Sequence, residues 1–293
     1  MSDRSRLLRI TGMVAGGLVV GAAAAVAIGS VAWRRTTARR LDLLADAMRQ
    51  RSPDAAPPLR HAELAALPAP VARYFAFTLP EGERRVRTAH IRWEGEMRLR
   101  PDAAWSPYTA AQSFTTYPPG FLWDAAVRMM PLVTVRVRDS YIASQGRMLG
   151  RLGGVATVVS EGGTPEMAQS ALARWLGEAA WFPTALLAGE GVTWEAVDDS
   201  TARATVTDGV VRVSGDFHFS PTGELTSMTA MRYRDVNGRG VLTQFEGRYG
   251  PFARVEGVMI PTTAEVAWLL PEGRFAYWRG RPVEVSYDLA PIR

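Results

Sequence analysis

The 293-residue sequence contains no cysteine and no lysine. The lack of cysteine excludes disulfides, thiolate metal sites and a cysteine nucleophile, and it leaves the redox compartment undetermined. All 34 basic side chains are therefore arginines, which are dispersed along the chain apart from a cluster near the amino terminus. Because the formal net charge of +5 is not gathered into one basic stretch, the sequence argues against nucleic-acid binding.

The motifs of common catalytic sites are also missing. Only three histidines occur, and the chain holds no HExxH pair, no glycine-rich phosphate loop and no G-x-S-x-G elbow. We therefore predict no cofactor, no bound metal ion and no catalytic residues, and a non-enzymatic role is the favoured interpretation.

A long uncharged run near the amino terminus, residues 10–33, reads ITGMVAGGLVVGAAAAVAIGSVAW. At about 1.5 Å per residue it is long enough to cross a hydrocarbon core of about 30 Å, and Trp33 would suit the membrane interface. The run predicts a single-pass transmembrane anchor. A cleaved signal peptide is the alternative, with 25–27 as an A-x-A site, but the apolar run continues beyond that point.

Arginines flank both ends of this run, so the membrane orientation is nearly balanced; we favour a main domain outside the cytoplasm. Gly12 and Gly16, like Gly17 and Gly21, are spaced to allow two such helices to pack closely. The predicted partners are therefore the membrane and a second copy of this helix.

Three regions follow from the composition. Residues 1–40 form the anchor with its basic flanks, and 41–67 form a linker with helical patterns and a proline-rich run at 52–58. Residues 68–293 form one β-rich domain, because apolar and polar residues alternate there over many short segments. The first expected strand is at 89–99. The others are at 108–117, 120–128, 132–139, 141–149, 152–160, 192–198, 201–207, 210–220, 224–234, 240–250, 258–270 and 281–289.

Short turns join these strands, with a turn expected at 145–147 and a hairpin turn at 220–223. Short connections favour antiparallel pairing, since parallel strands need long crossovers. We therefore predict a mainly β, α+β fold: a large curved antiparallel sheet or half-barrel with one helix inserted mid-chain.

The inserted helix is predicted to begin at 164–166, where a capping threonine precedes a proline and a glutamate. Pro183 should break it near 181–182. Arg174 and Glu178, four residues apart, are expected to pair. The apolar residues at helical spacing, which should form its buried stripe, are Leu172, Trp175, Leu176 and Ala179.

The stretch 173–187, ARWLGEAAWFPTALL, resembles a family of bacterial proteins of unknown function that carries a Trp-Phe-Pro-x-Ala-Leu-Leu element after such a helix. Agreement extends from 67 to 289, including Pro119-Gly120-Phe121-Leu122-Trp123 and Tyr277-Trp278-Arg279-Gly280-Arg281. The resemblance implies no activity. The order of strands is also similar to that of the lipoprotein-carrier half-barrels, which hold lipid chains between a curved sheet and helices.

Three functions are compatible with these features. The first is a membrane-anchored domain that binds an apolar or lipid-like ligand between the sheet and the central helix, and we favour it because aromatic residues are plentiful. The second is an enzyme that uses aspartate, histidine and arginine side chains, and the third is an assembly partner held at the membrane. The aromatic residues expected around the ligand are Trp93, Phe121, Trp123, Trp175, Trp181, Phe182 and Trp268.

Four polar residues complete the predicted site. Asp139 lies beside aromatic residues and, if buried, would need a partner, for which Arg138 and Arg174 are the candidates. Asp216 and His218 lie two apart on one strand and point the same way, as a base and its orienting group or two metal ligands would. The competing interpretation of that pair is a polar outer face of the sheet.

Overall fold

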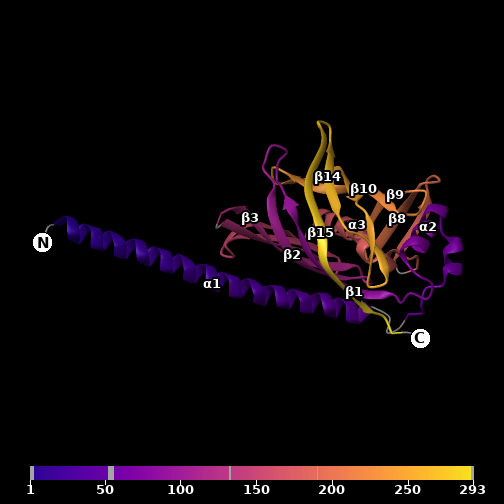
Figure 1. Ribbon diagram of the computed structural model, residues 1–293, viewed down its shortest axis with the longest axis horizontal. Helices are drawn as coiled ribbons and strands as arrows, with labels where there is room; N and C mark the ends of the chain where they lie inside the picture. The colour runs from indigo at the N-terminus through magenta and orange to yellow at the C-terminus, as the bar shows by residue number, and fades with distance from the viewer. Residues whose placement is uncertain (1–2, 52–55, 132, 190, 292–293) are drawn as a thin grey trace.

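The protein is built on a thirteen-stranded antiparallel sheet that curves around a central helix (Figure 1). The computed structural model describes residues 3–51, 56–131, 133–189 and 191–291, and within the first helix it describes side chains only at Gly21 and from Ala24 onward. The strand order is β6-β5-β4-β3-β2-β1-β15-β14-β11-β10-β9-β8-β7. The predicted mainly β half-barrel with an inserted helix is thus confirmed.

Most neighbouring strands are also consecutive in the chain, because tight turns connect them. The first half of the sheet contains β1 (Val86–Met97), β2 (Ser106–Thr115), β3 (Gly120–Met130), β4 (Val133–Ile142), β5 (Gln145–Leu152) and β6 (Ala156–Gly162). The second half contains β7 (Val192–Ala196), β8 (Thr201–Asp208), β9 (Val211–Phe219), β10 (Leu225–Val236), β11 (Arg239–Tyr249), β14 (Ala264–Leu270) and β15 (Gly273–Leu289). The β1–β15 pair joins the two halves.

Two details of the strands differ from the expectation. The predicted turn at 145–147 is wrong: the chain reverses at Ala143 and Ser144, where both residues have positive φ, and 145–147 belong to β5. The expected strand at 258–270 is split into β13 (Val258–Pro261) and β14, and β13 pairs with β12 (Phe252–Val255) in a separate ribbon.

The alternation of side chains decides which face of the sheet is inside. Gln112 on β2, Trp123 on β3 and Asp139 on β4 are register partners across neighbouring strands, so their side chains share the concave face. Leu122 and Asp124 therefore point to the convex face.

Helix α3 (Pro165–Glu178) fills the concave face, and its start follows the predicted chemistry. The Thr164 hydroxyl accepts a hydrogen bond from the backbone N–H of Met167 at 3.2 Å, and Pro165 occupies the first turn. The expected stripe Leu172, Trp175, Leu176 and Ala179 is fully buried. After Glu178 the chain continues as short 3-10 turns, η2 (Ala179–Trp181) and η3 (Pro183–Leu186), since proline cannot extend the helix.

One end of the half-barrel is closed by α2 (Ala69–Thr78), which follows η1 (His61–Ala66). Tyr74 and Phe75 of α2 are fully buried, and their rings lie 5.4 Å from Phe219 and 6.5 Å from Trp194. Arg73 donates to the carbonyl of Asp199 in the β7–β8 turn. This packing fills the end with aromatic side chains.

Helix α1 (Asp3–Arg51) crosses the convex face of the sheet and then runs far beyond the body toward the amino terminus (Figure 1). Leu44 packs against Leu122 and Ile142. Trp33 is 1 % exposed, and its indole N–H donates to both carboxylate oxygens of Asp124, at 2.9 and 3.1 Å. Trp33 is thus packed on the folded body, and its expected place at a membrane interface stays a prediction.

In the described part of the chain, no helix combines the length and the apolar character needed to cross a membrane. The run 10–33 expected to form an anchor lies mostly outside the described part, because the side chains of residues 10–20, 22 and 23 are not described. Gly12, Gly16 and Gly17 belong to that portion, so close pairing of two such helices stays a prediction.

Candidate functional site: an apolar cavity beside the central helix

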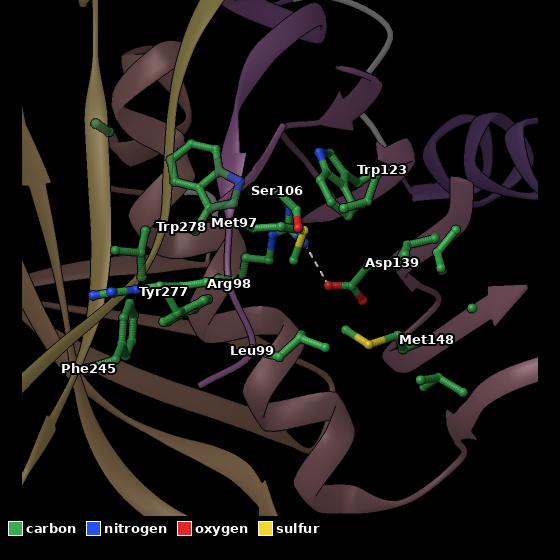
Figure 2. A pocket seen from close by; sticks show the side chains of 18 of the residues that line it. Met97, Arg98, Leu99, Ser106, Trp123, Asp139, Met148, Phe245, Tyr277 and Trp278 are labelled. Atoms are coloured by element: carbon green, nitrogen blue, oxygen red, sulfur yellow. Dashed lines mark hydrogen bonds and ion pairs between the residues drawn. The ribbon is translucent and has the colours of Figure 1, made fainter. Parts of the chain in front are cut away.

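A cavity of about 740 Å³ lies between the concave face of the sheet and the C-terminal half of α3. Its walls come from both halves of the sheet and are mainly apolar (Figure 2). Residues labelled around it in the close-up include Met97, Leu99, Trp123, Met148, Phe245 and Trp278. The volume falls in the range of about 300–1,000 Å³ that small-molecule sites occupy.

The mouth of the cavity carries exposed apolar side chains. Leu99, at the end of β1, is 72 % exposed; Met129 on β3 and Val158 on β6 are 41 % and 54 % exposed, and all three also line the cavity. Soluble surfaces rarely keep such groups together without a partner. The mouth therefore lies at the end of the β1–β6 half that carries the β1–β2, β3–β4 and β5–β6 connections.

Helix α1 leaves the body at this same end. Arg51, at its C-terminus, stacks over Tyr117 in the β2–β3 turn at the opposite end, at 5.8 Å. Gly29 packs against the β5–β6 turn, where the space for a Cβ atom would be 2.8 Å from the carbonyl oxygen of Gly154. The part of α1 before Gly29 consequently projects past the end at which the cavity opens.

A buried polar cluster forms one wall of the cavity. Arg174 on α3 makes the ion pair with Asp139 on β4 at 2.7 Å, and its Nε donates to Glu178 at 3.0 Å. Gln112 donates to the other oxygen of Glu178 at 2.8 Å. The Arg174 guanidinium also lies 5.0 Å from the ring centre of Trp123, so it is held by charge, hydrogen bonds and an aromatic face.

Two carboxylates share this single guanidinium. Burial, with the nearby charge of Asp139, raises the pKa of the Glu178 carboxyl despite the opposing effects of Arg174 and Gln112. Burial alone would lower the pKa of Arg174, but Glu178 and Asp139 outweigh it and the net shift is upward. Arg174 therefore stays charged.

The structure brings only part of the predicted site to the cavity. Trp123, Trp181, Asp139 and Arg174 line it. The other predicted aromatic residues lie in the surrounding core or behind the wall, and these are Trp93, Phe121, Trp175, Phe182 and Trp268.

Several of these core aromatics support the wall from behind. Trp93 packs edge-on against Trp181 with ring centres 4.8 Å apart. Trp175 is fixed by a hydrogen bond from its indole N–H to the carbonyl of Thr115, and Phe182 lies 4.6 Å from Phe114. Trp268 stacks on Tyr277, a lining residue, at 5.6 Å.

Asp216 and His218 are not part of the cavity. Asp216 accepts two hydrogen bonds from Arg203 on the outer face, at 2.7 and 2.8 Å, and this pairing keeps its pKa below the ordinary value. His218 lies 3.2 Å from the hydroxyl of Thr201. Across the described residues, no group of three or more histidine, aspartate or glutamate side chains is arranged to hold a metal ion.

Sequence reasoning missed several residues of the cavity, chiefly Met148, Val137, Tyr249 and Arg232. The alternation of β1 did place Met97 and Leu99 on the same face as Trp93, so that part of the wall was detectable. Arg232 carried no comparable signal, because one arginine among many on alternating strands indicates only an exposed position.

The fold and the cavity define a half-barrel with an internal apolar site beside its central helix. The chain belongs to a family of unknown function, DUF6920, whose model matches residues 65–287. The predicted resemblance over 67–289 is confirmed, and the family brings no activity with it. No curated protein matches the chain significantly.

Two solved structures are similar in architecture. One is a LolA superfamily protein from Nitrosomonas europaea, with 12 % identity over 77 % of this chain and 96 % of that chain and a TM-score of 0.36. The other is a DUF1329 family protein from Desulfovibrio piger, with 10 % identity over 70 % and 88 % and a TM-score of 0.38. Likenesses at this level say nothing about what this chain binds.

Proposed function

We propose that this protein binds an apolar or lipid-like ligand in the cavity between the sheet and α3. The observation that carries the proposal is the cavity itself: about 740 Å³, mainly apolar walls, and exposed Leu99, Met129 and Val158 at its mouth. Sites of this kind bury most of a ligand and use a few polar groups to orient it. Arg174, Asp139 and Glu178 are such groups on a mainly apolar surface.

We also propose that residues 10–28 anchor the protein in a membrane, with the main domain outside the cytoplasm. The support is the uncharged sequence of that run and the direction of α1, which leaves the body at the end where the cavity opens. In this arrangement the mouth faces the bilayer surface. A ligand then passes between the membrane and the cavity with little exposure of its apolar part to water.

Filling the cavity should weaken binding. In Val137→Trp the larger ring would occupy the space beside Met148, and we expect cross-linking of a diazirine-bearing dodecanol to lining peptides to fall about tenfold or more, equivalent to about 1.4 kcal/mol. The measurement is photo-cross-linking of the full chain in phosphatidylcholine nanodiscs, followed by peptide mass spectrometry.

The matched control is Ser286→Trp, which adds the same ring at an exposed position of β15 outside the cavity. It should cross-link like the unmodified protein. If Val137→Trp labels the lining peptides as strongly as the control does, the cavity is not the binding site.

Removal of residues 2–28 should release the protein from membranes. The truncation keeps Trp33 and the contacts of α1 with the sheet, so the body should still fold. We expect the full chain to sediment with membranes and resist carbonate extraction, whereas the truncated chain is recovered in the supernatant. A truncated chain that stays in the membrane fraction would overturn the anchor while leaving the cavity proposal intact.

A further inference from the structure

The charges that line the cavity are unequal in number. Among the described residues, four arginines line it, and the two lining carboxylates, Asp139 and Glu178, are both bound to Arg174. Formally, the lining carries two more positive than negative charges. Where such a charge is shielded from water beside apolar walls, it is costly unless an opposite charge joins it.

Arg232 on β10 is the lining cation that stands out. Its Nε donates to the carbonyl and the hydroxyl oxygen of Ser170, both at 3.0 Å, and its Nη1 donates to the hydroxyl of Tyr277 at 3.2 Å. All of these partners are neutral, and among the described carboxylates none forms an ion pair with it. The contacts fix the orientation of the guanidinium but do not neutralise it.

The surroundings of Arg232 are aromatic. The guanidinium carbon lies 5.7 Å from the ring centre of Phe245 and 5.9 Å from that of Trp268. Its bonds to Ser170 and Tyr277 use Nε and Nη1, which leaves Nη2 without a bond to a described protein group. A planar guanidinium held in this way suits a carboxylate or phosphate oxygen.

The remaining two lining arginines are engaged differently. Arg98 donates to the carbonyls of Ala276 and Pro101 and stacks on Trp105 at 4.6 Å. Arg100 lies near Asp102, at 3.6 Å, and both side chains are exposed. Figure 2 places Phe245 and Tyr277, which contact Arg232, on one side of the cavity and Asp139 and Met148 on the other.

We propose that the ligand is an amphiphile with an anionic head, that Arg232 binds the head, and that the tail lies on the apolar wall formed by Met97, Val137 and Met148. The shared chemistry is a carboxylate or phosphate on an alkyl chain. This inference rests on the proposed function, since it specifies which apolar ligand the cavity takes. A neutral lipid would leave Arg232 uncompensated.

The test compares three probes with the same diazirine-bearing dodecyl chain: dodecanoate, dodecyl phosphate and dodecanol. The full chain is used in phosphatidylcholine nanodiscs, and the concentration for half-maximal labelling of lining peptides is measured below the micelle threshold. We expect at least one anionic probe to label at about tenfold lower concentration than dodecanol, because hydrogen bonds to charged groups are stronger than neutral ones. Preference for the carboxylate indicates a fatty acid, and preference for the phosphate indicates a phospholipid-type head.

Variants of Arg232 test whether this side chain causes the preference for an anionic head. Arg232→Gln should remove the tenfold advantage of the anion and leave dodecanol labelling unchanged, while Arg232→Lys should retain part of it. Arg128→Gln, which removes one charge from an exposed position of β3 outside the cavity, should behave like the unmodified protein.

Two failures are distinguishable. Equal labelling by all three probes in the unmodified protein, or an anion preference that survives in Arg232→Gln, would overturn the inference about the head group. No labelling of lining peptides by any probe would overturn the proposed function itself. The comparison of probes on the unmodified protein holds even where a variant folds poorly.

Discussion

Replacing Arg174 by methionine is expected to lower the free energy of unfolding at neutral pH by about 3–5 kcal/mol, because it leaves two buried carboxylates without their cation. Asp139 is 2 % exposed and Glu178 is 16 % exposed at the side chain, so water cannot replace the guanidinium. Chemical denaturation of the purified chain, followed by circular dichroism, measures the change.

The loss of stability in Arg174→Met should depend on pH and should be larger at neutral than at acidic pH. Burial already raises the pKa of Glu178 in the intact cluster, and without Arg174 this effect is unopposed. A raised pKa in the folded state gives stability that is present below the unfolded value, near 4.5, and is lost as the pH rises through the folded value. Arg174→Met should therefore approach the unmodified protein at acidic pH and fall furthest behind it at neutral pH.

The control variant removes every charge of the Asp139–Arg174–Glu178 cluster. The triple variant Asp139→Asn, Arg174→Met and Glu178→Gln leaves no unpaired charge, and it should recover most of the lost stability at neutral pH. If the single variant is as stable as the triple variant across the pH range, the cluster is not a buried charge network.

Replacing Trp33 by alanine is expected to weaken the docking of α1 on the sheet by about 3–5 kcal/mol, the usual cost of truncating a buried tryptophan. The ring is enclosed between the sheet and the Arg138 guanidinium, whose carbon lies 4.2 Å from the ring centre. Its loss also leaves Asp124 without the indole N–H. Trypsin should then cleave the chain faster after Arg34, Arg35 and Arg39, and amide exchange over residues 34–51 should accelerate.

A phenylalanine at position 33 separates packing from hydrogen bonding. Trp33→Phe keeps much of the buried ring and loses only the donor to Asp124, which still accepts from Thr37 at 2.9 Å. We expect a loss of about 1–2 kcal/mol for this variant. Unchanged cleavage rates in Trp33→Ala would show that α1 is held by its other contacts, such as Leu44 and Arg51.

Local structure was largely predictable, since it depends on neighbours in the chain. Thr164 and Pro165 started α3 where their chemistry places a helix start, and Pro183 ended the regular helix nearby. Alternation identified most of the strands. The tight turn at Ala143 and Ser144 was missed because non-glycine residues seldom adopt positive φ, so neither residue signals a reversal.

The site was less predictable because it is assembled from residues far apart in sequence. Asp139 and Arg174 are separated by 35 positions and meet only because the sheet curves around α3. Trp123 and Trp181 line the cavity, while Trp93 and Trp175, which look equivalent in the sequence, are packed behind its wall. Whether a buried side chain borders the cavity or packs against other side chains depends on its neighbours in space, and its own residue type does not reveal it.

By itself, the sequence determined the mainly antiparallel β architecture, the position and buried face of the central helix, the family and the long uncharged run before Trp33. Those features follow from periodicity, capping and turn chemistry, which act over a few residues. Only the tertiary structure decided that Trp33 docks on the convex face and that the cavity opens at the end where α1 departs. It also decided that Arg232 lines the cavity without an ion pair to any described carboxylate. These outcomes depend on how the thirteen-stranded sheet bends and closes. That bending results from many contacts between residues that lie far apart in the sequence.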